Sequence, residues 1–420
     1  MSAWKHKVLV VGGGAAGMMA AGMAAKAGAK VILFEKNDRL GKKLAITGKG
    51  RCNVANDCSC DDVLKNIPRN SRFLYSALSA FTPADAMMFF EEYGCPLKVE
   101  RGNRVFPVSD KSGSVIAALQ EFLKKQKVEI RKEKVEEVVT REGAVAGVRT
   151  TQGMYYGRCV ILCTGGCSYP LTGSTGDGYR FAESVGHSIQ TPRGSLVPVE
   201  ENGDWCSKMQ GLSLRNVAVK LVNQKNKVVF EDFGELLFTH FGLSGPTVLS
   251  ASAHMKEKDS YKIRIDLKPA LDEQKLDQRI LRDFEQYHNR TIENALQDLF
   301  PKSLIPVMVA RAGIPVDTQA NSVTKQQRRA LLELTKAFSI DILGLRPVEE
   351  AIITAGGVKV KEVDPKTMES KFVDGLYFAG ELLDLDAYTG GFNLQIAWST
   401  AVAAGTAAGS RKFEECEVHE

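Results

Sequence analysis

The sequence lacks an apolar run long enough to cross a bilayer, and it lacks a strong excess of charge of either sign. No apolar segment reaches the roughly 18 residues that a spanning helix needs. The formal net charge of +5 is small against 55 basic and 50 acidic residues, so it gives no clear signal for nucleic acid. The N-terminus enters the first expected strand almost at once, which leaves no room for a signal peptide. We therefore expect a cytoplasmic protein with no membrane partner. The sequence leaves its oligomeric state open.

The sequence also lacks the cysteine patterns typical of zinc sites and of redox-active disulfides. Nine cysteines are scattered along the chain, and only Cys58 and Cys60 lie close together. No second pair or histidine cluster completes a zinc site, so we expect no metal. The close CxxC or CxxxxC pair of a flavin-linked disulfide reductase is absent as well. Reduced thiols with mainly structural roles are the expectation.

A glycine motif stands near the N-terminus. Residues 12–17 read Gly-Gly-Gly-Ala-Ala-Gly, and they follow the apolar run Val8–Val11. The first glycine allows a tight strand-to-helix turn, Gly14 lets the backbone approach a pyrophosphate, and Gly17 permits close helix packing. A second expected strand ends in Glu35, whose carboxylate can accept ribose hydroxyls. The pattern predicts a Rossmann-type dinucleotide-binding unit.

A second glycine-rich region lies near the C-terminus. An expected strand at 376–379 leads into Gly380-Glu381, and Gly390-Gly391 opens a small-residue helix expected to run to about Ala408. The glycine lets the backbone approach a ribitol phosphate, and the carboxylate of Glu381 can bind ribitol hydroxyls. Because FAD contains ribitol and NAD does not, the two regions together predict an FAD site. The helix N-terminus could stabilise negative charge on the reduced ring.

The pattern between these regions changes from α/β to β-rich and then to helical. We predict an α/β protein with a discontinuous Rossmann-type FAD-binding domain, formed by residues 1–192 and 340–420. Alternating strand-like runs place a β-rich subdomain at 193–268. Helical patterns place a second inserted subdomain at 269–339.

Three further motifs resemble those of a known family. They are Gly-Lys-Gly-Arg-Cys-Asn at 48–53, Thr-Gly-Ser-Thr-Gly-Asp-Gly-Tyr at 172–179 and Leu-Phe-Thr-His-Phe-Gly-Leu-Ser-Gly-Pro at 237–246. Over essentially its whole length the chain is similar to the BaiN/YhiN-type flavoproteins. That family includes enzymes described as bile-acid 3-dehydro-Δ4,6-reductases and as aminoacetone oxidases.

The motifs and the resemblance together imply noncovalent FAD. The residues expected to hold it are Gly12, Gly14, Ala15, Ala16, Gly17, Glu35, Lys36, Lys42, Lys43, Thr47, Gly48, Arg51, Cys52, Asn53, Val135, Thr164, Gly165, Gly166, Gly380, Glu381, Gly391, Phe392, Asn393 and Leu394.

Few side chains stand out for proton transfer. His240 lies in the 237–246 motif, and Tyr388 precedes the Gly390-Gly391 turn. We predict catalytic roles for both, with the inserted region covering the flavin. A histidine between two phenylalanines is equally compatible with a buried structural position.

The sequence leaves three functions open. The resemblance implies reduction of an activated C=C bond of a small hydrophobic substrate by NAD(P)H. The donor would bind transiently, because no second GxGxxG motif follows. The first alternative is a flavin oxidase of small amines that uses O₂. The second is a non-catalytic flavin-dependent protein that holds a partner through the basic region around Arg328-Arg329.

Overall fold

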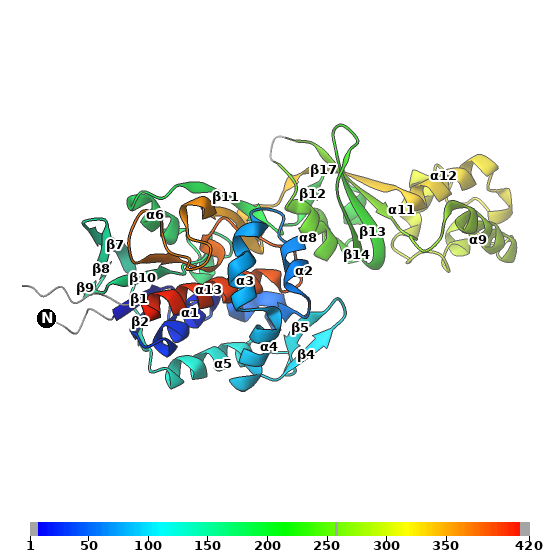
Figure 1. The fold of residues 1–420 in the computed structure, drawn as a ribbon. Helices are drawn as coiled ribbons and strands as arrows, with labels where there is room; N and C mark the ends of the chain where they lie inside the picture. The colour runs from blue at the N-terminus through cyan, green and yellow to red at the C-terminus, as the bar shows by residue number, and fades with distance from the viewer. Residues whose placement is uncertain (1–6, 257–258, 412–420) are drawn as a thin grey trace, which may run out of the picture. The chain divides into compact units, whose positions relative to one another are not determined.

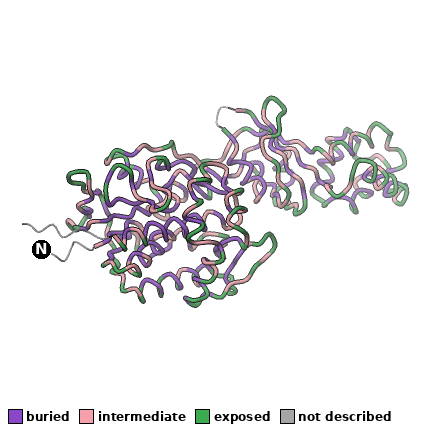
Figure 2. The backbone as a smooth tube through the Cα atoms, viewed as in Figure 1, coloured by how far each residue is buried: buried purple, intermediate pink, exposed green. Residues whose placement is uncertain are grey.

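A parallel β-sheet forms the centre of the first of two compact units in this computed structural model, which describes residues 7–256 and 259–411. The first unit runs up to Gly194 and resumes at Ala351, and Ser195–Glu350 forms the second. The five strands, in spatial order, are β19 (Leu376–Phe378), β10 (Cys159–Leu162), β1 (Lys7–Val11), β2 (Lys30–Phe34) and β6 (Glu129–Arg131). The inner strands are apolar and buried, as expected where both faces of a sheet are covered (Figure 2).

Two helices from opposite ends of the chain lie side by side in this unit. They are α1 (Ala15–Lys26) and α13 (Phe392–Ser410), the blue and red helices of Figure 1. Small residues allow the close approach: a Cβ atom at Gly405 would lie 2.5 Å from the Ala20 carbonyl oxygen. A Cβ atom at Gly409 would overlap the Ala24 carbonyl oxygen. The packing brings both helix N-termini to the same edge of the sheet.

Shorter elements surround this centre. The helices are α2 (Cys60–Lys65), α3 (Tyr75–Ala80), α4 (Pro83–Glu92), α5 (Ser112–Lys125) and α6 (Asp177–Ser184). One small antiparallel sheet contains β3 (Ala55–Asn56), β4 (Leu97–Glu100) and β5 (Arg104–Pro107), and another contains β7 (Val135–Arg141), β8 (Ala144–Thr150) and β9 (Gly153–Tyr156). Where the chain leaves and re-enters the unit, β11 (Ile189–Ser195) pairs with β18 (Ile353–Val358).

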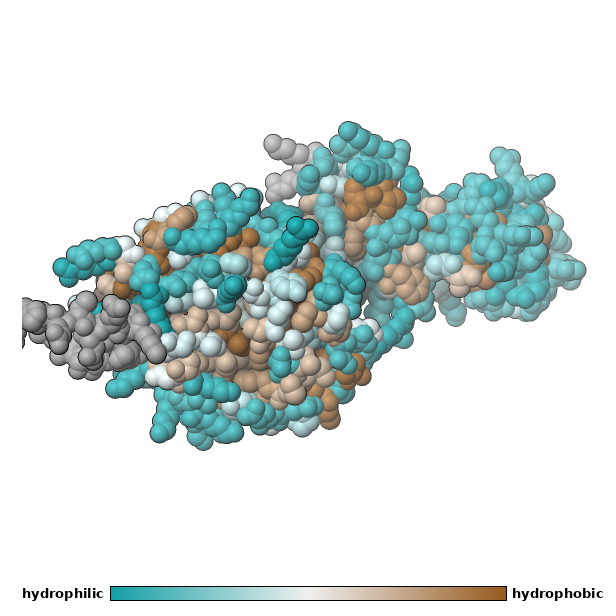
Figure 3. Space-filling model, in the orientation of Figure 1, coloured by the Kyte–Doolittle hydropathy of each residue, from teal (hydrophilic) through white to brown (hydrophobic). Residues whose placement is uncertain are grey.

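The second unit is built on a closed antiparallel barrel. Its strands, in spatial order, are β12 (Val199–Glu201), β15 (Gly242–Ser244), β14 (Val228–Phe238), β13 (Ser213–Asn223), β16 (Tyr261–Asp266) and β17 (Phe338–Leu345). Its helices are α7 (Trp205–Lys208), α8 (Pro246–Ser252), α9 (Glu273–Gln286), α10 (Ile292–Ala295), α11 (Ile305–Arg311) and α12 (Lys325–Lys336). Hydrophilic side chains cover most of the α9–α12 end (Figure 3).

The predicted fold class is confirmed: an α/β Rossmann-type domain carries a barrel-like insertion. One strand, β17, belongs to the inserted unit, whereas the sequence pattern placed most of it in the Rossmann-type domain. Strand β17 follows the helices in sequence but pairs with β16 and β12, so residues 340–350 belong to the inserted unit rather than to the Rossmann-type domain. The apolar alternation of β17 does not show which sheet it joins, because that depends on partners far away in sequence.

Within the described ranges, no helix is long and apolar enough to span a membrane. The eight cysteines in these ranges are free thiols, and Cys416 lies outside them. Burial raises the pKa of the Cys52 thiol to about 12, so this cysteine is protonated at neutral pH.

The close approach of α1 and α13 can be tested with Gly405→Ala. The added methyl group meets the Ala20 backbone, so we expect a loss of about 1–3 kcal/mol in the free energy of unfolding, measured by chemical denaturation. Gly113→Ala on α5 is the matched control, because a Cβ atom there meets no heavy atom within 4 Å. Equal stability of the two variants would show that the helices can separate without cost.

Candidate functional site

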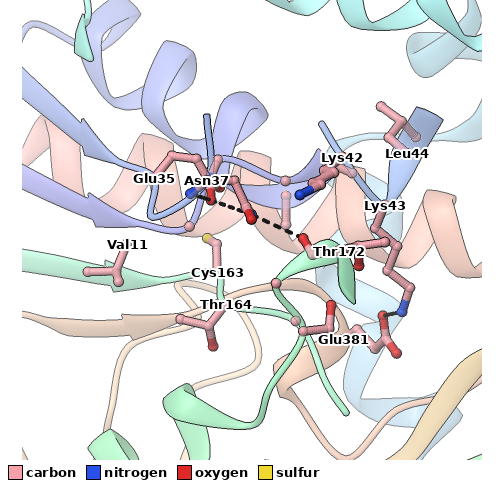
Figure 4. A pocket seen from close by; sticks show the side chains of 18 of the residues that line it. Val11, Glu35, Asn37, Lys42, Lys43, Leu44, Cys163, Thr164, Thr172 and Glu381 are labelled. Carbon is pink, nitrogen blue, oxygen red and sulfur yellow. Dashed lines mark hydrogen bonds and ion pairs between the residues drawn. The ribbon is translucent and has the colours of Figure 1, made fainter. Parts of the chain in front are cut away.

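A pocket lies at the carboxyl ends of β1, β2 and β10, the place where open α/β sheets bind ligands. All of its lining residues belong to the first unit. Figure 4 shows side chains from both ends of the chain around it, among them Glu35 and Glu381. The pocket therefore combines the two glycine-rich regions that the sequence predicted to form one site.

In the glycine motif, neighbouring backbone atoms leave no space for a side chain at Gly12 and Gly17, whereas the space at Gly14 is open. Gly12 has a φ of +104°, and a Cβ atom there would lie 2.5 Å from the Cys163 carbonyl oxygen. At Gly17 a Cβ atom would overlap the Gly12 carbonyl oxygen, so helix and turn are in direct backbone contact. At Gly14, which lines the pocket, a Cβ atom meets nothing within 4 Å. The turn is thus tightly packed behind and open in front.

Helix α1 begins at Ala15, directly beside the open position. Its N-cap is Gly14, which has no side chain to cap the first turn, and Ala15 and Ala16 line the pocket. Unpaired N–H groups and the helix dipole favour an anion at such a terminus. A diphosphate therefore matches this wall of the pocket.

Glu35 is held firmly at the end of β2. The residue is only 8% exposed, and one carboxylate oxygen, Oε2, accepts a hydrogen bond of 2.7 Å from the Gly13 N–H. The other, Oε1, accepts two hydrogen bonds of 2.7 Å from the backbone and side-chain nitrogens of Asn37. Among the described residues, Oε2 accepts only the hydrogen bond from Gly13 and keeps further accepting capacity, so the carboxylate can still bind a hydroxyl group.

Glu381 is held by donors from three other segments. Lys43 Nζ lies 2.5 Å from one carboxylate oxygen and donates to Ser168 Oγ at 2.7 Å. The other oxygen accepts from Ser168 Oγ at 2.9 Å and from the Thr354 N–H at 2.8 Å. The glutamate side chain is 12% exposed and lines the pocket. In this structure Lys43 thus pairs with Glu381 and with Ser168.

Two buried oxygens near these segments have no hydrogen-bond partner among the residues that the structure describes. They are Thr164 Oγ1, in the pocket wall, and Asn53 Oδ1. Such groups are costly unless they find a partner. Together with the open Gly14 position and the two fixed carboxylates, they fit a ligand with a diphosphate and several hydroxyl groups, which is the chemistry of FAD.

More than half of the predicted cofactor residues line the pocket. These are Gly12, Gly14, Ala15, Ala16, Glu35, Lys36, Lys42, Lys43, Thr47, Val135, Thr164, Gly165, Glu381, Asn393 and Leu394. The predicted residues outside this lining are Gly17, Gly48, Arg51, Cys52, Asn53, Gly166, Gly380, Gly391 and Phe392.

Several of the residues outside the lining support it from behind. A Cβ atom at Gly166 would overlap Thr354 Oγ1, and one at Gly380 would lie 2.8 Å from the Ala16 Cβ atom. At Gly391, where φ is +101°, it would overlap the Ala55 carbonyl oxygen. These glycines allow neighbouring segments to meet.

Arg51 has other partners. Its guanidinium pairs with Glu100 and Asp110, with an Nε–Oδ1 distance of 2.8 Å to Asp110, and lies 4.1 Å from the centre of the Phe106 ring. Hydrogen bonds from Arg51 to Glu100 and Asp110 raise its pKa further above its usual range. Arg51 therefore joins the loop after η1 (Leu44–Gly50) to the β4–β5 sheet.

The two predicted catalytic residues belong to different units. His240 is exposed in the turn between β14 and β15, with its ring 5.0 Å from that of Phe241. Tyr388 is half-buried in the first unit, outside the pocket lining, and its N–H donates to the Asn66 carbonyl oxygen at 2.9 Å. His240 is thus not a buried structural residue, and the catalytic roles of both side chains stay predictions.

Sequence reasoning missed part of the pocket wall. Asn37, Ile352 and Ile353 line the pocket, as do Thr172 to Ser174 and Asp177. The Thr-Gly-Ser-Thr-Gly-Asp-Gly motif could have indicated the last group, because it follows β10 at the same sheet edge. Nothing in the sequence around Asn37 indicates its contacts with residues more than 130 positions away.

The sequence matches the family described as HI0933-like protein Rossmann domain over residues 6–407, and the chain belongs to this family. It is a FAD-dependent oxidoreductase. The 3-dehydro-bile acid Δ(4,6)-reductase of Clostridium scindens is 31% identical over 97% of this chain and 100% of that protein. The ribosomal RNA dihydrouridine synthase of Haemophilus influenzae is 30% identical over 94% of this chain and 96% of that protein.

Solved structures show the same fold at lower identity. The 3-ketosteroid Δ1-dehydrogenase of Sterolibacterium denitrificans is 14% identical, with a TM-score of 0.52 over 97% of this chain and 100% of that one. The 3-ketosteroid-Δ4-(5α)-dehydrogenase of Rhodococcus jostii RHA1 is 16% identical, with a TM-score of 0.50 over 97% and 98%.

Because the space at Gly14 is open, we predict that Gly14→Ala weakens cofactor binding without destabilising the protein. The added methyl group meets no protein atom within 4 Å but occupies space beside the helix terminus. We expect the affinity for FAD, measured by quenching of flavin fluorescence, to fall by at least about tenfold, a change of 1.4 kcal/mol. The thermal unfolding temperature of the apoprotein should stay unchanged. Parent-like FAD affinity would place the diphosphate elsewhere.

Proposed function

We propose that the protein uses noncovalent FAD in this pocket to reduce a C=C bond conjugated to a carbonyl group in a small hydrophobic substrate, with NAD(P)H as electron donor. One observation carries the proposal. The Clostridium scindens relative, which aligns along its whole length, is named for the reduction of double bonds in a 3-dehydro compound. In such a compound a ketone activates the neighbouring double bonds.

The residues of the pocket have distinct tasks in this proposal. The N-terminus of α1 and Gly14 would hold the diphosphate, Glu35 the ribose hydroxyls and Glu381 the ribitol hydroxyls. The N-terminus of α13, where Asn393 and Leu394 line the pocket, would stabilise negative charge near the ring. Bound flavin supplies hydride chemistry that no side chain can perform.

The substrate's own electronics explain why the double bond must be conjugated. Its carbonyl group draws electron density from the far carbon of the C=C bond, which can therefore accept a hydride equivalent. Saturation also requires one proton at the carbon next to the carbonyl. NAD(P)H supplies the hydride equivalent, and an acidic side chain or water must supply the proton. His240 and Tyr388 remain the candidates for that proton transfer.

A second candidate substrate follows from other relatives. The Haemophilus influenzae and Escherichia coli relatives, at 30% and 29% identity, are named ribosomal RNA dihydrouridine synthases. Their product is a uridine whose ring C=C bond, next to a carbonyl, has been saturated, so the same reaction type serves both substrates. Residues 195–350 contain as many basic as acidic residues, which gives this unit no overall attraction for a polyanion. We therefore favour the small substrate.

The substrate class can be tested by comparing two electron acceptors. With NADH or NADPH, we expect oxidation of the nicotinamide to depend on a 3-oxo-Δ4,6-steroid and to yield a saturated product by mass spectrometry. An unmodified ribosomal RNA transcript should give no dihydrouridine. Dihydrouridine formation without steroid turnover would select RNA instead. Hydrogen peroxide produced from a small amine, without NAD(P)H, would identify an amine oxidase.

Catalysis by His240 can be tested with His240→Ala. If the imidazole transfers a proton, flavin reoxidation by substrate should slow by about 10²–10⁴-fold while FAD stays bound. Stopped-flow absorbance would measure flavin reduction and reoxidation separately. His288→Ala is the matched control, because His288 is also exposed on the second unit, at the end of α9. Parent-like rates in both half-reactions would remove His240 from the mechanism.

A further inference from the structure

Asn37 joins two parts of the pocket wall that are far apart in sequence. Its side-chain nitrogen donates to Glu35 Oε1 at 2.7 Å and to the Thr172 carbonyl oxygen at 3.1 Å, as the dashed lines of Figure 4 show. A Cβ atom at Gly173 would lie 2.6 Å from the same nitrogen, so the absence of a side chain there permits the contact. One amide group therefore fixes both a cofactor-binding carboxylate and the opposite wall.

The neighbouring residue makes a parallel connection. Lys36 Nζ donates to Thr175 Oγ1 and to Asp177 Oδ2, each at 2.7 Å. The side chains of Lys36 and Asp177 are 27% and 22% exposed, so solvent weakens this ion pair only partly. Consecutive residues after Glu35 thus bind three positions between Thr172 and Asp177.

The segment that they hold is a chain of tight turns, which we call the strap and define as residues 169–176. Tyr169, Gly173 and Gly176 all have left-handed backbone conformations, with φ of 53°, 102° and 77°. Residues Thr172 to Ser174 line the pocket. In contrast, Leu171 at the tip is 91% exposed, so the tip is not packed into the core. Within the strap, Asn37 holds Thr172 and Lys36 holds Thr175.

We infer that Lys36 and Asn37 form a latch that holds the strap across the FAD site and thereby controls how fast the cofactor enters and leaves. This inference rests on the proposed FAD site. Asn37 is in addition a positioning residue, because it donates two hydrogen bonds to the Glu35 carboxylate, beside the one from the Gly13 N–H. Opening the strap breaks the hydrogen bonds from Asn37 to Thr172 and from Lys36 to Thr175.

Exchange kinetics of FAD test the latch directly. Apoprotein is mixed with FAD, and flavin fluorescence gives the association rate; release is followed after adding an excess of a competing apo-flavoprotein. In Asn37→Ala and Lys36→Met we expect FAD release to be at least about tenfold faster, because hydrogen bonds to a charged partner are lost. Lys30→Met, an exposed lysine at the start of β2, is the matched control and should stay within about twofold of the parent.

The outcomes separate the two proposals. A parent protein that binds no FAD would overturn both of them. A parent that binds FAD, with variants that release it at the parental rate, would overturn the latch alone. Thermal unfolding of each apoprotein shows whether a variant is folded, and Asn37→Ser keeps a small polar side chain as a second test at the same position if Asn37→Ala unfolds.

The isosteric variant Asn37→Asp gives a signature that a merely structural role would not give. It places a second carboxylate against Glu35 Oε1, where the parent has a donor at 2.7 Å. Two carboxylates this close share one proton, so the pKa of the pair is raised. The FAD affinity of this variant should rise towards the parental value as the pH falls from 8 to 5.5, and that of Asn37→Ala should not. The other ionisable groups lining this end of the pocket are Lys36, Glu133, Lys134 and Asp177. The same pH dependence in both variants would remove Asn37 from the positioning of Glu35.

Discussion

The site depends on direct backbone contact between the first turn and the first helix. Because a side chain at Gly17 would overlap the Gly12 carbonyl oxygen, α1 can lie against the turn only where glycine is present. The same closeness continues on the other side of α1, where Gly405 and Gly409 of α13 meet its backbone. The two helices form one layer on the sheet, and their N-termini reach one pocket because neither can move away from the other.

The two carboxylates of the pocket are positioned in a similar way. Glu35 and Glu381 each follow a strand of the parallel sheet, and each is held by donors from another part of the chain. Hydrogen bonds from several donors restrict the rotamers of each carboxylate. A ligand that offers hydroxyl groups then meets acceptors already in place. Preorganisation of this kind reduces the ordering cost of binding.

The features that sequence predicted are those determined by local backbone geometry. The glycine turn, the strand that ends in Glu35 and the helix after Gly391 follow from short-range patterns, and the structure contains all three. The partners of Arg51 and Asn37 could not be predicted in this way, because Glu100, Asp110 and Thr172 approach them only through the tertiary fold. Strand β17 is a similar case: its alternation fits a strand of the barrel or of the Rossmann sheet equally, and only its long-range pairing decides between them.

The unpaired groups of the first unit connect cofactor binding with folding. Three buried groups have no hydrogen-bond partner in the described part of the chain: Thr164 Oγ1, Asn53 Oδ1 and the Tyr179 hydroxyl. An unsatisfied group of this kind costs about 1–3 kcal/mol. A ligand that supplies even one of these partners removes a cost that the folded apoprotein bears. Because such a ligand binds only the folded chain, its binding free energy adds to stability. A cofactor pocket built from both ends of the chain therefore ties those ends together more firmly when it is filled.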